Sequence, residues 1–196
     1  MTRRGFGFEM QGALAASREL GDLAHKLPQV QERAVGTLRR RLPVEARRDI
    51  QGEYNVRADR VRKDLSVRTG GDGIALVGHF RGIGLRNFRA RQVRRGVTSA
   101  IFRGARRSLD EGAFMTPLLG GGVHAVQRAG AKRVMTKGRY VGKSRQPLEV
   151  LYGPTLAQML RKGRRPERLA DFARTTLRAE VNRQLDALQR RQSRTA

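Results

Sequence analysis

The segment Pro147 to Leu160, PLEVLYGPTLAQML, constrains the fold of this chain more than any other stretch. An apolar run ends at Tyr152-Gly153-Pro154, and apolar residues at helical spacing follow at once, from Leu156. Gly permits positive φ, and Pro fixes φ at a value suited to the first turn of a helix. We therefore expect a structural corner at which a strand ends and a helix begins.

The N-terminal third is predicted to be helical, because apolar residues recur at helical spacing on both sides of two prolines. The first row is Ala13, Leu14, Ala16, Leu20, Leu23 and Leu27, and the second is Val30, Ala34, Leu38, Leu42, Ala46 and Ile50. Pro28 is expected to start a new helix. Pro43 is expected to kink or split the second helix, since it lacks an N–H group and clashes with the preceding turn. A further short basic helix is expected over residues 54–65.

The middle of the chain has the pattern of a β region. Residues 66–78, SVRTGGDGIALVG, are typical of a β-hairpin around Gly70–Gly73. Residues 81–91 show no clear period and are predicted to be a loop. The other expected strands are Gln92–Phe102, Val123–Arg128, Arg133–Thr136 and Leu148–Leu151.

The C-terminal part is predicted to be a long helix that opens at Pro166, with apolar residues at the 3.6-residue period. We therefore predict an α+β fold: a small, mostly antiparallel sheet flanked by N-terminal helices and a long C-terminal helix. We expect a single domain over residues 1–196. Its parts are a helical part (1–65), a basic β region (66–153), C-terminal helices (154–190) and a basic tail (191–196).

Positive charge is the second strong feature. The chain has 42 Lys and Arg against 17 Asp and Glu, a net charge of +25. From Gly73 to Leu148 there are 16 basic residues and only two acids, Asp110 and Glu111. One interpretation is that Arg merely coats a solvated surface. The other is that the β region faces an acidic partner, with DNA phosphates as the leading candidate. The few aromatic residues argue against a base-stacking platform for single strands.

The residues we expect to make these charge contacts lie in two stretches of the β region. They are Arg89, Arg91, Arg94, Arg95, Arg103, Arg106 and Arg107, then Lys132, Arg133, Lys137, Arg139 and Lys143.

Several segments resemble catalytic or ligand-binding motifs, but none of them has the required residues at the required spacing. Residues 138–144, GRYVGKS, resemble a phosphate-binding loop but have one residue too few between the glycines. His25, His79 and His124 are far apart, without paired ligands at metal spacing. Asp110-Glu111 more often caps or turns a chain than acts as an acid–base pair. The Tyr152 ring is expected to pack under the corner. We predict no catalytic, cofactor-binding or metal-binding residues; a nucleotide-dependent enzyme is the weaker alternative.

Composition also bears on cellular location. Cysteine is absent, which excludes a disulfide framework and thiolate metal sites. No stretch approaches the roughly 20 apolar residues of a membrane span, and the N-terminus lacks the apolar core of a secretory signal. No membrane association is predicted.

The order of landmarks resembles the bacteriophage minor tail protein Z family, the tail completion proteins. The landmarks are the helical N-terminal third, Tyr54 and the hairpin around Gly70–Gly73, then the segments Ile83–Phe88, Gly112-Ala113-Phe114 and Gln127-Arg128, and finally the Pro147–Pro154 corner. The resemblance runs from Ala13 to Leu188. Its combination of motifs is moderately specific, and no single one is highly so.

This resemblance implies a structural virion protein and not an enzyme. Such a protein acts in tail completion and head–tail joining, at the neck or the head-proximal end of the tail. Its partners would be the tail terminator, tube or connector rings, and packaged DNA through its phosphates. It implies a homo-oligomeric ring such as a hexamer, located in the virion and, during assembly, in the host cytoplasm. The alternative is a stand-alone protein that binds nucleic acid without sequence specificity.

Overall fold

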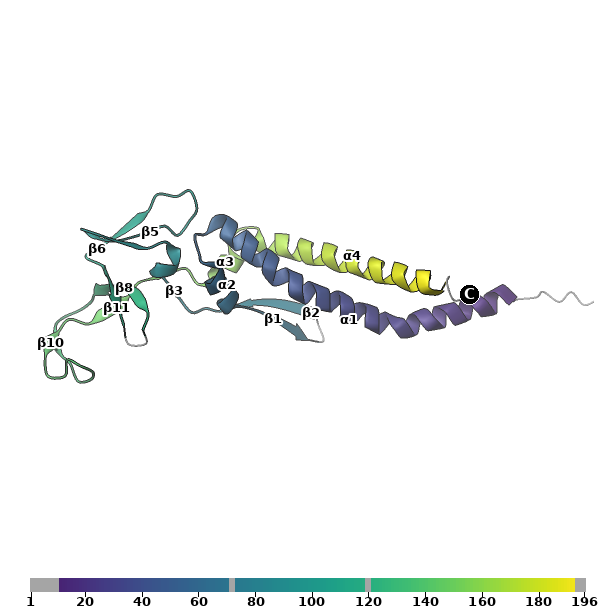
Figure 1. The fold of residues 1–196 in the computed structure, drawn as a ribbon, viewed down its shortest axis with the longest axis horizontal. Helices are drawn as coiled ribbons and strands as arrows, with labels where there is room; N and C mark the ends of the chain where they lie inside the picture. The colour runs from purple at the N-terminus through teal and green to yellow at the C-terminus, as the bar shows by residue number, and fades with distance from the viewer. Residues whose placement is uncertain (1–10, 71–72, 119–120, 193–196) are drawn as a thin grey trace, which may run out of the picture. The chain divides into compact units, whose positions relative to one another are not determined.

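The computed structural model describes residues 11–70, 73–118 and 121–192 (Figure 1). The fold is α+β, as predicted, with long helices near both ends of the chain and short antiparallel strands between them. The chain divides into two compact units. Unit 1 comprises residues 1–40 and 173–196, and unit 2 comprises residues 41–172. The predicted basic tail lies mostly outside the described residues.

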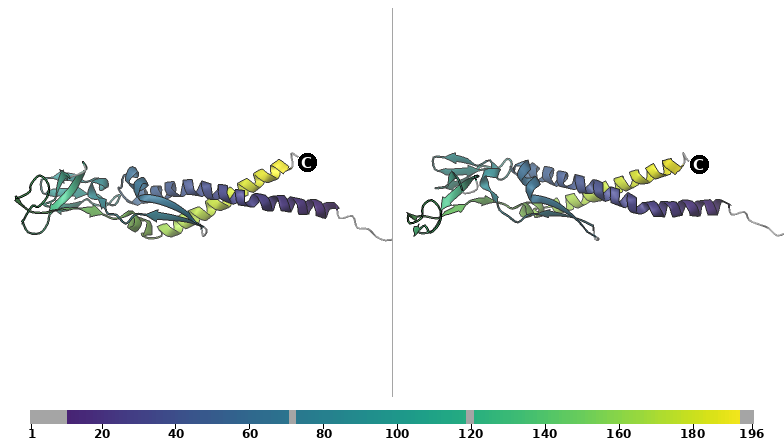
Figure 2. Two further views of the ribbon diagram at one scale, coloured as in Figure 1. Left: turned by 90° about the horizontal axis from the view of Figure 1, so that it is seen from below. Right: turned by 60° about the horizontal axis from the view of Figure 1, so that its bottom comes forward.

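Unit 1 is built from two helix segments that run in opposite directions. They belong to α1 (Gln11–Glu53) and α4 (Arg165–Gln192), and Figure 2 shows that they cross. Val30, Ala34 and Leu38 are buried on α1. Arg33 of α1 donates to the side-chain oxygen of Gln184 on α4 at 3.4 Å. An apolar row at four-residue spacing is what places one face of α1 in a core.

The helix start expected at Pro28 and the alternative that Pro43 splits the helix are wrong, because α1 is a single helix of 43 residues that passes through both prolines (Figures 1 and 2). A kink at Pro43 stays a prediction. A proline inside a helix costs about 3 kcal/mol. The buried row continues past Pro43 with Ala46 and Ile50, both fully buried. Each large apolar side chain that is fully buried contributes about 1.5–3 kcal/mol. The burial of the row therefore outweighs the lost hydrogen bonds.

Unit 2 contains two short helices, a 3₁₀ helix and all the strands that the structure describes. The helical elements are α2 (Ala58–Asp64), η1 (Leu85–Phe88) and α3 (Leu156–Arg161). The strands are β1 (Leu65–Gly70), β2 (Gly73–Gly78), β3 (Ile83–Gly84), β4 (Arg91–Val93), β5 (Gly96–Ser99), β6 (Ser108–Glu111), β7 (Phe114–Pro117), β8 (Val123–Arg128), β9 (Arg133–Val134), β10 (Ser144–Arg145), β11 (Leu148–Val150) and β12 (Tyr152–Gly153).

These strands form several small antiparallel sheets, where one was predicted. The sheets are β1-β2, β4-β5-β6, β7-β8-β11, β3-β12 and β9-β10. The predicted hairpin is confirmed as β1-β2, and β8 has the predicted bounds. The single strand expected over residues 92–102 is wrong, because a turn divides it into β4 and β5. Strands β6 and β7 were not predicted.

One apolar cluster joins the small sheets to the helices. It contains residues from the end of α1, from α2, β3, η1, β5, β8 and α3, and from the segments between elements: Ile50, Tyr54, Val56, Val61, Ile83, Leu85, Phe88, Val97, Ala113, Ala125, Leu156 and Met159. The loop predicted over residues 81–91 is therefore wrong in its middle, since Ile83, Leu85 and Phe88 are core residues of β3 and η1. A segment this short shows no period from which burial could be predicted.

The expected start of a helix at Tyr54 is also wrong. Tyr54 forms an isolated β-bridge with Phe102, and their ring centroids lie 5.0 Å apart. The Asn55 N–H donates to the Ile101 carbonyl at 2.8 Å. The chain is therefore extended here, and α2 begins four residues later.

The corner at Tyr152–Pro154 is confirmed: β12 ends at Gly153, and α3 begins at Leu156. Thr155 caps α3, because its hydroxyl accepts from the Gln158 N–H and the Gln158 side chain accepts from the Thr155 N–H. The φ of Gly153 is not positive, so the backbone conformation does not explain the glycine here. The reason is the space available for a side chain. A Cβ there would lie 2.5 Å from Cε2 of Phe88.

Candidate functional site: a cationic pocket

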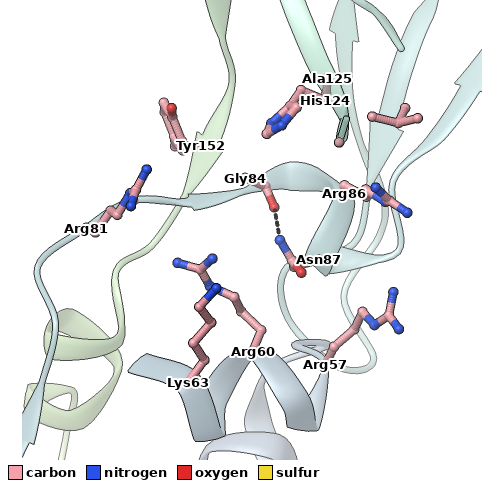
Figure 3. A pocket seen from close by; sticks show the side chains of 13 residues that line it. Arg57, Arg60, Lys63, Arg81, Gly84, Arg86, Asn87, His124, Ala125 and Tyr152 are labelled. Carbon is pink, nitrogen blue, oxygen red and sulfur yellow. Dashed lines mark hydrogen bonds between the residues drawn. The ribbon is translucent and has the colours of Figure 1, made fainter. Parts of the chain in front are cut away.

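A cavity of about 580 Å³ in unit 2 has five cationic side chains among its thirteen lining residues (Figure 3). Four arginines and one lysine line it: Arg57, Arg60, Lys63, Arg81 and Arg86. The other lining residues are Gly82, Gly84, Asn87, Gly122, Val123, His124, Ala125 and Tyr152. No carboxylate is among these lining residues. This composition suits an anionic ligand, because a compact anion can bind several cations at once.

Helix α2 supplies one wall of the pocket. Asp59 in its first turn and Arg62 and Lys63 in its last turn complement the helix dipole. Val61 is fully buried and anchors the helix to the core. Arg60 and Lys63 are three residues apart and therefore share one face. Figure 3 shows both side chains extending from α2 into the pocket.

The opposite wall comes from β3, η1, β8 and β12. Asn87 donates its side-chain amide to the Gly84 carbonyl at 3.1 Å, which fixes the turn between β3 and η1. His124 and Tyr152 enter the pocket from this side (Figure 3). A Cβ at Gly82 would lie 3.0 Å from Cγ and Cδ1 of Tyr152. The absence of a side chain at Gly82 therefore lets the Tyr152 ring rest on the backbone.

Two of the five cations have a carboxylate nearby. Arg60 pairs with the buried Asp64 at 2.7 Å, and Arg57 lies 3.4 Å from the exposed Asp59. Within the described residues, no carboxylate lies within 4.0 Å of Lys63, Arg81 or Arg86. These three side chains are also exposed to solvent. The pocket therefore keeps a net positive charge that the described part of the chain does not neutralise.

A second charge cluster lies where the C-terminal end of α1 meets α3 and the start of α4. The Arg165 guanidinium donates to Asp49 at 3.2 Å, to Glu53 at 2.7 Å and to the Met159 carbonyl. Arg168 also pairs with Asp49, at 2.7 Å. Every cation of this cluster has an acidic partner, so the cluster is a structural clamp and offers no anion site.

Lys162 completes the clamp. It pairs with Glu53, and its ammonium lies 4.0 Å from the centroid of the Phe102 ring. The hydrogen bond from Lys162 lowers the pKa of Glu53, with a further contribution from Arg165 against the opposing effect of burial. The same hydrogen bond raises the pKa of Lys162. Both charged forms are therefore favoured in the folded chain.

The structure separates the predicted contact residues into two groups and places none of them in the pocket lining. Arg89, Arg91, Arg94, Arg95, Arg103, Arg106 and Arg107 lie on or beside the β4-β5-β6 sheet. Lys132, Arg133, Lys137, Arg139 and Lys143 lie on the hairpin arm, which we define as residues 129–147 around β9 and β10. All are exposed except Arg107.

Arg107 has a structural role that the sequence prediction missed. It donates to the Arg89 carbonyl at 2.5 Å and to the Thr98 carbonyl at 3.1 Å. Arg95 is paired with Glu111 at 2.5 Å. The expectation that Asp110-Glu111 turns the chain is confirmed: both residues end β6, the Ala113 N–H donates to the Asp110 carbonyl at 3.3 Å, and Gly112 in this turn has φ of 72°.

The rejected motifs lie apart from the pocket, with one exception. Residues 138–143 lie in the loop between β9 and β10, and Ser144 begins β10. In the parts of the chain that the structure describes, no group of three or more His, Asp or Glu side chains could hold a metal. His25 lies in α1 and His79 follows β2, whereas His124 lines the pocket.

Tyr152 corrects a further prediction. Its ring was expected under the corner, yet the side chain is 59% exposed at the pocket. The adjacent Gly153 packs under the corner in its place, against Phe88. The local signals for the pocket were the three-residue spacing of Arg57, Arg60 and Lys63 and the two glycines after Arg81. Neither signal shows that the segment from Arg57 to Lys63 lies beside the segment that follows Arg81.

Comparison with known proteins gives no match: no family model, no curated protein and no solved structure matches this chain. Among the helices of residues 11–192 that the structure describes, none has the length and apolarity needed to cross a membrane.

Proposed function

We propose that this chain is a structural protein of a tailed bacteriophage virion. It acts in tail completion and head–tail joining, at the neck or the head-proximal end of the tail. Its partners are the tail terminator, tube or connector rings, and its own copies form a ring. The proposal rests on the order of sequence landmarks that resembles the minor tail protein Z family.

The observation that carries the proposal is the corner itself. It belongs to the combination of motifs on which the resemblance depends. Its Gly153 packs against the fully buried Phe88, while Thr155 caps the next helix. A close-packed, capped joint transmits position from the sheets to the helix without a flexible linker. An assembly protein that holds two rings in register needs such a joint.

The hairpin arm supplies a surface for the partner. Val134 and Val141 are 61% and 59% exposed on it, among Lys132, Arg133, Lys137, Arg139 and Lys143. The Arg145 guanidinium lies 3.7 Å from the centroid of the Tyr140 ring. Exposed apolar side chains within a cationic segment suit an acidic protein surface that also offers apolar contacts. DNA phosphates would contact only the cationic side chains of the arm and would leave its exposed apolar side chains without a partner.

The decisive experiment uses the phage that encodes the chain. The protein should be present in purified virions, and an amber mutation in its gene should give full heads and tails that fail to join. Electron microscopy of the lysate measures the joined fraction. Absence of the protein from virions, or normal particles without it, would contradict the proposal.

Charge-neutral variants test the role of the arm. The substitutions K132Q, R133Q, K137Q and R139Q together should reduce complementation of the amber mutant. The matched control carries R62Q, R68Q, R161Q and R164Q, four exposed sites that lie outside the arm and the pocket lining. Equal complementation by the two variants would remove the arm from the proposal.

A stand-alone nucleic-acid-binding protein is the second candidate, favoured by the 16 basic residues against two acids between Gly73 and Leu148. Binding through phosphates falls steeply with salt, because each contact releases counterions. Nanomolar binding to DNA with a steep salt slope, together with no association with tail components, would favour this candidate over the virion protein.

A further inference from the structure

The cationic pocket has features beyond its charge. Tyr152 lies at its edge with the ring resting on the Gly82 backbone and 59% of the side chain exposed. Lys63, Arg81 and Arg86 also line it without carboxylate partners in the described chain. An exposed aromatic ring beside unpaired cations is the combination that binds a base and its phosphate together.

We propose that this pocket binds a nucleoside phosphate, with the phosphate held by Lys63 and Arg81, which lie on the same side of the pocket as Tyr152 (Figure 3), and the base stacked on Tyr152. The nucleoside phosphate is either a free nucleotide or one nucleotide of a single-stranded nucleic acid. This inference does not rest on the proposed virion role, because the resemblance implies no ligand for the lining residues and the predicted contact residues lie outside the pocket lining.

The size of the cavity fits this ligand class. Its volume of about 580 Å³ lies within the range of about 300–1,000 Å³ that is typical of small-molecule sites. An inorganic phosphate would occupy a small part of it and would leave Tyr152 without a contact. A nucleotide reaches both the cations and the ring.

Several polar groups are positioned to orient the base and sugar. Asn87 has one amide hydrogen committed to the Gly84 carbonyl, which fixes its carboxamide in the lining. His124 lines the same wall from β8. A few fixed polar groups beside an aromatic ring are typical of sites that hold a heterocycle in one orientation.

An acidic peptide is the competing ligand, since carboxylates also bind arginine in bidentate geometry. It makes no use of the exposed Tyr152 ring, because Asp and Glu have no flat face to stack. The tyrosine therefore favours the nucleotide. Duplex DNA is also disfavoured, since its bases are stacked on one another and cannot lie on Tyr152.

Fluorescence anisotropy with the purified full-length chain tests the proposal. The probe is a labelled oligothymidylate of ten nucleotides, and the competitors are unlabelled thymidine monophosphate, inorganic phosphate, a duplex of equal length and polyglutamate of equal charge. Competition by the mononucleotide identifies a free nucleotide as a sufficient ligand. Binding of the oligonucleotide alone identifies the strand, and both results support the site.

The variants separate the pocket from general charge. K63Q/R81Q should weaken oligonucleotide binding more than the control R62Q/R68Q, which removes the same charge from exposed sites outside the pocket lining. The salt slope of log K should fall by about 0.7 for each lost phosphate contact. Tyr152→Ala should weaken binding about 5- to 150-fold, as expected for one stacked base. Tyr152→Phe should stay within about twofold of the parent, since stacking needs only the ring.

Three results would each overturn the proposal. The first is an equal loss in K63Q/R81Q and R62Q/R68Q, which would show diffuse charge attraction. The second is unchanged binding by Tyr152→Ala. The third is competition by polyglutamate or the duplex as strong as that of the single strand. All substituted residues are exposed, so circular dichroism of each variant should match the parent and keep the binding comparison valid.

Discussion

Arg165 donates from its Nη2 to Oε2 of Glu53 at 2.7 Å, and its side chain is only 1% exposed. Arg165 stands in the first turn of α4, where the helix dipole disfavours a cation, and Glu53 ends α1, where it disfavours an anion. The pairing offsets both unfavourable positions. It also connects residues that are 112 positions apart in the sequence.

Arg165→Met should destabilise the fold, because it leaves Asp49 and Glu53 without their buried partner and removes one of the two donors to the Met159 carbonyl. The two carboxylates keep 21% and 38% exposure, so water compensates in part. We expect a loss of about 2–4 kcal/mol in the free energy of unfolding. Urea denaturation measures it, with Arg164→Gln, at the exposed neighbouring position, as control. Equal midpoints for the two variants would contradict the clamp.

Acid should weaken the clamp through Glu53. Its pKa is lowered from an ordinary value of 4.5, chiefly by the hydrogen bond from Lys162. The unfolded chain therefore takes up this proton at higher pH than the folded chain does. The contribution of Glu53 to stability is complete above pH 4.5 and is lost as the pH falls through the lower folded pKa.

Urea denaturation of the parent and Glu53→Gln at a series of pH values between 3 and 7 tests this dependence. The difference in stability between them should shrink as the pH falls below 4.5. Glu149→Gln, at an exposed position of β11, is the matched control and should follow the parent at every pH. If the difference in the free energy of unfolding between Glu53→Gln and the parent is the same at every pH, the negative charge of Glu53 does not stabilise the fold.

Alkali should weaken the same clamp from the other side. The pKa of Lys162 is raised from an ordinary value of 10.5, mainly by its hydrogen bond to Glu53. A raised pKa gives stability that is complete below 10.5 and is lost as the pH rises through the folded value. Thermal melts between pH 9 and 12 should show this loss of stability in the parent and should not show it in Lys162→Met. A parent without that loss would contradict the assignment.

Local signals in the sequence predicted the elements whose formation depends on neighbouring residues. The hairpin around Gly70–Gly73, strand β8 and the corner at Gly153 were all expected, because turn glycines and alternation are local features. The segment 81–91 was missed, since the burial of Ile83 and Phe88 depends on contacts with distant strands and α3. The helix break expected at the prolines failed for the same reason: burial along α1 keeps the helix continuous through Pro28 and Pro43.

The candidate site was not predictable from the sequence as a site. Its cations come from α2 and from the segment around β3, and its tyrosine comes from β12, about 90 residues after α2. Charge density directed the prediction to Arg94 and Lys137, which lie in the most basic stretches. The pairing of β3 with β12 is what brings Tyr152 beside Gly82, and two-residue strands carry no signal of their partner.

Gly153→Ala should destabilise the corner, because the new methyl group would lie 2.5 Å from Cε2 of the fully buried Phe88. Overpacking of this kind costs about 1–3 kcal/mol. The same substitution at Gly52 meets nothing within 4 Å and lies in α1, so it should stabilise by up to about 1 kcal/mol. In thermal melts, the melting temperature of Gly153→Ala should be lower than that of the parent, and that of Gly52→Ala should be higher. Partial recovery in the double variant Gly153→Ala/Phe88→Leu would trace the cost to this contact, whereas a neutral Gly153→Ala would disprove it.

Arg107 and Arg106 should differ although they are neighbours in a basic loop. Arg107 donates to the Arg89 carbonyl and the Thr98 carbonyl, and Arg89 itself has a left-handed backbone with φ of 54°. A non-glycine residue in that conformation is held by its surroundings. Arg107→Gln should therefore lower the free energy of unfolding by about 1–2 kcal/mol, since hydrogen bonds from a charged donor are the stronger ones. Arg106→Gln, at an exposed position, should leave the urea midpoint unchanged. If both variants unfold at the urea midpoint of the parent, the hydrogen bonds of Arg107 do not stabilise the fold, and the prediction is wrong.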